Sequence, residues 1–305
     1  MERKMRDFIR NLSLFLVKIP AWVLICPVFF ILLYHQFAVF DGKNRENTEN
    51  TGEFTVTPSE SEMQVFETIE NLPPDSKVLI LVNYGPESRY ELETAMSALI
   101  GFLAEKNIGI AFATMIPNGI ESAFMAVEKS VENGSFGRER FVYGHEYTHL
   151  GFIVGGNIAT YLIANNFTEV RERDIFNSNL DIRQPLMNGI ENISDFSAVF
   201  EFSSQTFDGV PGLVSFGVML KDKNIKKIAF CSSDMLSAYI PFRGSLYLDG
   251  LVGGFRSIAV FIHEFQPDRK IEKQYEFLSM ILIYIIGLVI IANLAKLVVK
   301  DKRKK

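Results

Sequence analysis

The apolar residues between positions 60 and 265 follow two alternating patterns. Runs of consecutive apolar residues, each of strand length, are separated by stretches in which apolar residues recur every three or four positions, as on one face of a helix. The runs predict strands at 77–84, 108–115, 150–154, 197–202 and 227–230. The periodic stretches predict helices at 87–106, 118–132, 157–167, 214–220, 233–240 and 255–263. Together they indicate an α/β fold, with a parallel sheet covered by helices on both faces, as in Rossmann-like domains.

Two longer apolar runs flank this region. Residues 19–40 include no Lys, Arg, Asp or Glu over 22 positions, and residues 277–295 include none over 19. Because a helix rises 1.5 Å per residue, either run can cross a hydrocarbon core of about 30 Å. The first run exceeds the usual signal-peptide core of about 7–15 residues, which predicts a retained anchor. The predicted parts are basic tails (1–18 and 296–305), transmembrane helices (19–40 and 277–295), a stalk with a short helix (41–74) and an α/β domain (75–276).

The charge distribution predicts the orientation of these parts. Both short tails are basic, with net charges of +3 and +5, whereas residues 41–276 hold 20 Lys and Arg against 33 Asp and Glu, a net charge of −13. By the positive-inside rule, both termini lie in the cytoplasm and the acidic domain lies outside it. A domain with this charge repels a polyanion, so nucleic acid is excluded as a partner. The predicted partners are the lipid bilayer and other membrane proteins or further copies of the chain.

Small polar residues and glycines follow the predicted strands. Ligands of parallel sheets bind outside the carboxyl ends of the strands, so these residues are candidates for a binding site. The same residue types also serve as turn and cap residues in any βα loop, so this alternative stays open. The candidates are Asn83, Asn118, Gly155, Gly156, Asn157, Ser204, Ser233 and Asp234.

The string His145-Glu146-Tyr147-Thr148-His149 matches the zinc motif H-E-x-x-H, in which two histidines on a helix bind the metal and the glutamate activates water. Glu169 follows at a spacing similar to that of the third ligand in thermolysin-like peptidases. Glycines on both sides disfavour the long helix that the motif requires. We therefore expect no metal and a loop with two surface histidines, so that His149→Ala changes stability by no more than about 1 kcal/mol. Zinc, held by His145, His149 and Glu169 with Glu146 as base, is the alternative.

Three short motifs resemble a family of prokaryotic two-span membrane proteins of uncharacterised activity. Residues 150–156 correspond to its L-G-Y-K-P-G-G, residues 174–180 to D-Y-Y-G-T-P-L and residues 250–256 to G-L-L-G-G-L-R-G. The resemblance implies an α/β domain between terminal spans and implies no activity. This chain departs from the pattern, with Ile153-Val154 in place of Lys-Pro and Asn177-Ser178 in place of Gly-Thr.

Two functions fit this sequence. The first is a membrane-anchored, extracytoplasmic binding or assembly module without catalytic activity. The second is a membrane-anchored hydrolase, either a zinc metallopeptidase through the His145–His149 string or an enzyme with another group at the strand ends. Cys231 follows an apolar run and is predicted to be a small buried hydrophobic residue, not a nucleophile.

The predicted orientation can be tested by cysteine labelling in intact cells. A membrane-impermeant maleimide should modify a cysteine introduced at Asn50 and spare one introduced at Lys304, because only the first lies outside the cytoplasm. Permeabilised cells are the control, in which both positions should react. Labelling of Lys304→Cys alone in intact cells would invert the topology.

Overall fold

The computed structural model describes residues 57–133, 141–155, 158, 161, 163–164, 172–180, 184–207, 209–220 and 225–266, together with 284, 285 and 287. Residues 56–269 form one compact unit, and all that follows concerns this unit. No helix within the described residues is both long and apolar enough to cross a membrane. The two predicted spans, 19–40 and 277–295, lie outside the described residues apart from 284, 285 and 287.

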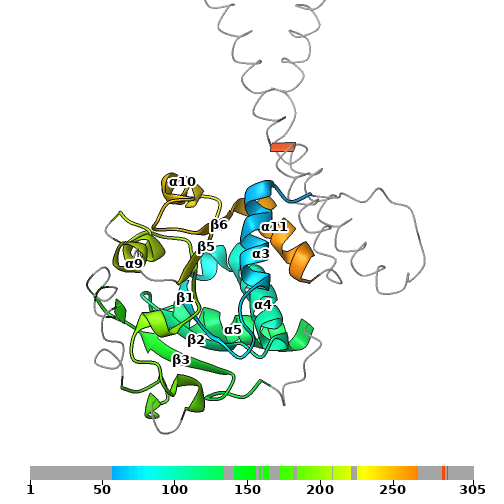
Figure 1. Ribbon diagram of the computed structural model, residues 1–305. Coiled ribbons are helices and arrows are strands. Elements are labelled where there is room, and N and C mark those ends of the chain that lie inside the picture. Colours follow the sequence, from blue (N-terminus) through cyan, green and yellow to red (C-terminus); the bar gives the residue numbers. More distant parts are fainter. Residues whose placement is uncertain are drawn as a thin grey trace, which may run out of the picture. The chain divides into compact units, whose positions relative to one another are not determined.

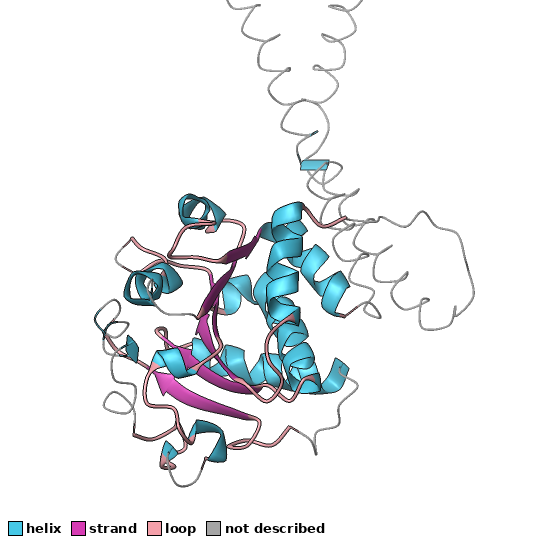
Figure 2. Ribbon diagram, viewed as in Figure 1, coloured by secondary structure: helices cyan, strands magenta, loops and turns pink. Residues whose placement is uncertain are grey.

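The domain is a six-stranded parallel sheet with helices, which confirms the predicted α/β class (Figures 1 and 2). The strands are β1 (Lys77–Asn83), β2 (Gly109–Thr114), β3 (Tyr147–Phe152), β4 (Ala198–Ser203), β5 (Lys226–Cys231) and β6 (Gly250–Gly253). Their order across the sheet is β3-β2-β1-β4-β5-β6. This is the doubly wound order of Rossmann-like domains, in which the chain reverses direction across the sheet between the first and fourth strands.

Helices cover both faces of this sheet. They are α3 (Glu60–Glu70), α4 (Arg89–Glu105), α5 (Gly119–Asn133), α9 (Gly212–Leu220), α10 (Leu236–Tyr239) and α11 (Gly254–Phe265). Leu79, Val199 and Ala229 point toward α9 and α10, where they pack in one core cluster with Phe216 and Tyr239. Figure 1 shows α3, α4 and α11 on the other side of the sheet. Because both faces are covered, the strands consist of nearly continuous apolar residues.

Aromatic rings fill the core between the sheet and α11. The Phe202 and Phe230 rings stack with centroids 4.4 Å apart on neighbouring strands, and Phe230 meets Phe261 of α11 edge to face at 4.8 Å. Phe66 of α3 and Phe102 of α4 both contact Phe265, at 5.6 and 4.8 Å. Edge-to-face and stacked pairs each add about 0.5–1.5 kcal/mol beyond simple burial. The rings therefore bind α3, the first described helix, to the rest of the domain.

The structure adds one strand that the sequence pattern did not predict. Residues 250–253 form β6, whereas the pattern was interpreted as a glycine-rich turn. Its glycines are explained by close packing. A Cβ on Gly250 would lie 2.7 Å from a Val65 methyl, and one on Gly253 would lie 2.6 Å from the Cys231 sulfur. β6 was missed because glycine is unusual inside strands.

The outer edge of β3 is closed by local hydrogen bonds. The Tyr147 and His149 carbonyls accept from the Gly144 and Ile175 amides at 2.7 and 3.1 Å. The His149 amide donates to the Tyr143 hydroxyl at 3.3 Å, and the Gly151 amide donates to Nδ1 of the His149 ring at 2.8 Å. These groups would otherwise be open to another strand.

Asp174 holds the segment that covers this edge. Its Oδ1 accepts from the Phe176 and Ser178 amides at 2.9 and 2.7 Å, and its Oδ2 accepts from the Tyr143 hydroxyl at 3.0 Å and from the Gln184 amide. Burial raises the pKa of Tyr143 to about 12, so this hydroxyl keeps its proton at physiological pH. Asp174, which begins one of the three short motifs, is therefore a structural anchor.

Replacing Asp174 by alanine should lower the free energy of unfolding by about 2–4 kcal/mol, because four donors lose their shared acceptor, a buried carboxylate. Asp195 is the matched control, since its carboxylate also accepts from two backbone amides but is exposed. Asp195→Ala should cost about 1 kcal/mol. Denaturant unfolding of the full-length protein in detergent measures both. Equal losses would contradict the anchoring role of Asp174.

Candidate functional site

The predicted candidates lie at the carboxyl edge of the sheet as far as the structure describes them. Asn83 ends β1, Ser204 follows β4, and Ser233 and Asp234 follow β5, while Asn118 precedes α5. Neighbouring loops are joined by backbone bonds, since the Ser204 amide donates to the Asn83 carbonyl at 3.2 Å. Gly155 follows β3 and is exposed. Two candidates, Gly156 and Asn157, lie outside the described residues.

The centre of this edge is a buried carboxylate that the sequence analysis did not single out. Glu201 lies on β4 with no exposed surface. Its Oε1 accepts from the Asn83 side-chain amide at 2.8 Å, and its Oε2 accepts from the Tyr239 hydroxyl and the Leu213 amide, both at 2.7 Å. Asn83 in turn accepts from the Met115 amide through Oδ1 at 2.9 Å. The Asn83–Glu201–Tyr239 network thus joins β1, β4, α9 and α10.

Two opposing effects set the ionisation of this carboxyl group. Burial raises the pKa of Glu201, whereas the hydrogen bonds from Asn83, Tyr239 and the Leu213 amide lower it, and burial has the larger effect. All three partners donate, so the network is complete without a ligand. Both carboxylate oxygens of the fully buried Glu201 accept from protein donors, and we assign this residue a structural role.

Carboxylates also occupy the entrance to the switch point between β1 and β4. Glu87 accepts from the Gly85 amide at 3.2 Å and from the Ser204 hydroxyl at 3.3 Å. Glu91 of α4 accepts from the Ser233 hydroxyl at 2.8 Å and from the Ser233 amide at 3.3 Å. In nucleotide-binding Rossmann domains, backbone amides at this position bind phosphate. Here the protein's own acidic side chains take these amides.

The candidates therefore divide by exposure. Asn83 is fully buried and faces the Glu201 network, so it does not line an open surface. Asn118, Ser233 and Asp234 are exposed. The Ser233 hydroxyl, besides contacting Glu91, accepts from the Phe255 amide at 3.2 Å at the start of α11. The structure brings the β1, β4 and β5 loops together and uses their polar groups to bind one another.

The expectation of two surface histidines is wrong for His149. Residues 147–152 form strand β3, so the H-E-x-x-H string is not helical and its two histidines do not share a helix face. The His149 side chain is 1% exposed and stacks on Phe124, with ring centroids 5.6 Å apart. Its Nδ1 accepts from the Gly151 amide. The zinc motif needs a helix to bring its two histidines together on one face, whereas here His145 precedes the strand and His149 lies within it.

The remaining residues of this string lie in the turn before β3 and at its start, apart from the buried His149 ring. His145 is exposed in the turn before β3, and Oε2 of Glu146 accepts from the Val142 amide at 2.8 Å. Glu169, the alternative third zinc ligand, lies outside the described residues. Among the described residues, no group of three His, Cys, Asp or Glu side chains could hold a metal ion.

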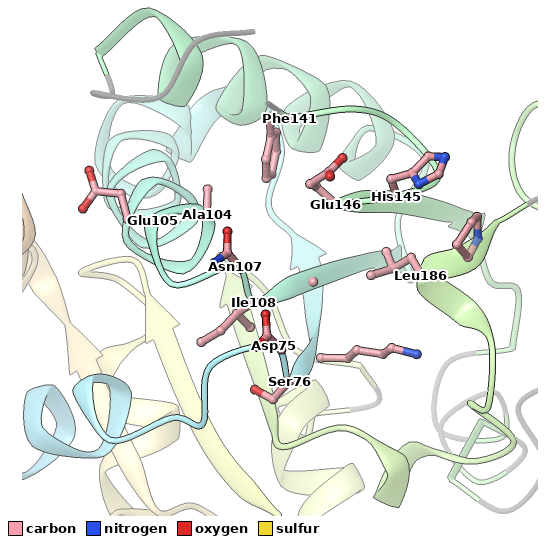
Figure 3. Close-up of a pocket in the computed structure, with 13 residues that line it drawn as sticks. Asp75, Ser76, Ala104, Glu105, Asn107, Ile108, Phe141, His145, Glu146 and Leu186 are labelled. Atoms are coloured by element: carbon pink, nitrogen blue, oxygen red, sulfur yellow. The ribbon is translucent and has the colours of Figure 1, made fainter. Parts of the chain in front are cut away.

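A pocket of about 590 Å³ lies at the opposite, amino edge of the sheet (Figure 3). Lys77 and Gly109, which begin β1 and β2, line it together with His145 and Glu146, which precede β3. Its walls include the buried side chains of Ile108, Phe141 and Leu186. The small polar residues that follow the strands point only to the carboxyl edge, so the sequence did not predict this pocket. Glu146, read as a possible catalytic base, is one of its acidic groups.

Cys231 is buried, as the sequence predicted. Burial, reinforced by the neighbouring carboxyl groups of Glu91 and Glu201, raises the pKa of its thiol. A thiol kept protonated and covered is a poor nucleophile.

Comparisons with known proteins give no further assignment of this site. A scan against protein-family models, a search of curated proteins and a search of solved structures each found no match to this chain.

His149→Ala should lower the free energy of unfolding by about 2–4 kcal/mol, because it removes a buried ring and leaves the Gly151 amide without its acceptor. His145→Ala, the exposed control, should change it by no more than about 0.5 kcal/mol. Thermal or denaturant unfolding measures both variants, and metal analysis of each should match wild type. Stoichiometric zinc that disappears in His149→Ala would instead restore the metallopeptidase interpretation.

Proposed function

We propose that this chain is a membrane-anchored, extracytoplasmic binding or assembly module that is not catalytic and whose switch point is closed to nucleotides. The observation that supports this proposal most directly is the pairing of Glu87 with the Gly85 amide and of Glu91 with Ser233. A phosphate group at this entrance would meet two carboxylates in place of open amide donors. Repulsion between like charges in a partly buried site opposes such binding.

The buried groups of the same edge also support binding over catalysis. A catalytic acid, base or nucleophile has to reach substrate, at hydrogen-bond distance or through one water. Glu201 and Cys231 have no exposed surface, and both oxygens of Glu201 accept hydrogen bonds from protein donors. The zinc hydrolase alternative loses its main support because His149 is a core residue of β3.

The membrane part of the proposal rests on the sequence. The two apolar runs and the basic tails predict the anchoring, and the labelling of Asn50→Cys and Lys304→Cys tests it. The resemblance to uncharacterised two-span proteins agrees with this architecture. Within the described residues, the three motifs fall on the end of β3, the Asp174 anchor and the β6–α11 junction.

Isothermal titration of the full-length protein in detergent with ATP or NAD should give no saturable binding up to about 1 mM, and neither nucleotide should be consumed. Glu87→Ala exposes the Gly85 amide and is the variant in which weak phosphate binding should first appear. Saturable nucleotide binding by the wild type, or turnover, would overturn the proposal.

A further inference from the structure

The pocket at the amino edge has more acidic than basic groups. Asp75, Glu105 and Glu146 line it, against the single ammonium of Lys77. That ammonium donates to the Asn188 carbonyl at 2.6 Å. Three carboxylates against one ammonium give these groups an excess of two negative charges. The predicted extracytoplasmic region, with a net charge of −13, adds a field of the same sign that attracts cations.

Two of these carboxylates are available to a ligand. Oε2 of Glu146 accepts from the Val142 amide, which fixes the side chain and leaves Oε1 for another partner. The Asp75 carboxylate makes no hydrogen bond within the described part of the chain and is exposed at the pocket rim. Figure 3 shows Glu146 with Phe141 on one side of the pocket and Asp75 on the other. A ligand between them would meet negative charge from two directions.

The rest of the lining favours an organic cation over a metal ion. Ile108, Phe141 and Leu186 are buried apolar side chains that line the same pocket. A metal ion needs several oxygen or nitrogen ligands at bonding distance, and no such group of side chains occurs among the described residues. An aromatic ring and aliphatic walls beside carboxylates suit an ammonium or guanidinium group on an apolar body. A volume of about 590 Å³ falls within the range of small-molecule sites.

We infer that this amino-edge pocket binds an organic cation, an alkylammonium or guanidinium group joined to an apolar chain, through Asp75 and Glu146. The inference rests on the proposed function, since it names the ligand class of the proposed binding module. It places the ligand at the edge of the sheet opposite the switch point, whose polar groups are already paired.

Titration calorimetry of the full-length protein in detergent, at low salt, tests this inference with two probes of nearly equal shape. N-acetyl-arginine methylamide contains a guanidinium group, and N-acetyl-citrulline methylamide contains a neutral urea in its place. The arginine probe should bind saturably and at least about tenfold more tightly than the citrulline probe, because a charge-assisted hydrogen bond is lost in the second. n-Butylammonium, as a third probe, distinguishes a free amine from a side chain within a peptide as the source of the cation.

Variants connect this binding to the pocket. Asp75→Asn keeps a residue type that tolerates the φ of 57° found there, and Glu146→Gln keeps an oxygen for the Val142 amide. Each should weaken the arginine probe about tenfold. Glu264→Gln removes an equal charge from an exposed position on α11, away from the pocket lining, and should have no effect. Ala104→Leu adds bulk to the lining without changing charge and should weaken the arginine probe and n-butylammonium.

Melting temperatures close to wild type establish that each variant is folded. Equal affinity for the arginine and citrulline probes, or arginine binding that Asp75→Asn and Glu146→Gln leave unchanged, would overturn the inference. So would the absence of binding by both the arginine probe and n-butylammonium. These outcomes leave the proposed function standing, because that proposal is judged by cysteine labelling and by nucleotide titration.

Discussion

A carboxylate placed where water does not reach must obtain its hydrogen bonds from the protein, and Glu201 imposes this requirement on the centre of the domain. Asn83, Tyr239 and the Leu213 amide meet it. Each comes from a different segment, so satisfying one side chain fixes the relative positions of β1, β4 and the two helices α9 and α10. An isolated buried charge would cost several kcal/mol, and this cost disfavours any arrangement in which one partner is displaced.

This requirement also explains the close approach of α9 to the sheet. A Cβ on Gly212 would lie 2.4 Å from Oε1 of Glu201 and 2.8 Å from the Met115 side chain. Glycine at the first position of α9 lets the next amide, that of Leu213, reach the carboxylate. The same tight construction leaves the switch point with polar groups that are already paired, whereas the pocket of about 590 Å³ lies at the amino edge. The network that stabilises the domain and the pocket proposed to bind a ligand therefore lie at opposite edges of one sheet.

The sequence predicted the elements whose patterns were determined by burial on two faces. The β1, β2, β4 and β5 strands are mainly apolar runs, and α4, α5, α9 and α11 were predicted close to their observed bounds. The apolar pattern did not predict β6, in which glycines replace apolar residues. It also did not predict that His149 lies in a buried strand, because the zinc motif, with glycines on both sides, suggested a loop with surface histidines. Because β3 includes His, Thr and Tyr, its burial cannot be predicted from its own residue types and depends on the elements packed against it. His149 is covered by Phe112 and Phe124, which are distant in sequence.

The candidate sites were less predictable than the fold for a related reason. Glu201 stood in the apolar run Ala198–Ser203, and a lone acidic residue in such a run signals a buried group with dedicated partners. Which partners it has depends on the strand order, and the sequence does not state that order. The amino-edge pocket gave no local signal, because its acidic residues come from the start of β1, the end of α4 and the turn before β3.

The closed edge of β3 has a consequence for how copies of this domain meet. A bare outer strand would let a neighbouring molecule extend the sheet through its backbone, which is how ordered aggregates grow. Here a tyrosine hydroxyl, an imidazole nitrogen and two backbone amides occupy outward-facing groups of β3. Copies that meet at this edge find these backbone groups already hydrogen-bonded, so association of the domain there has to proceed through side chains.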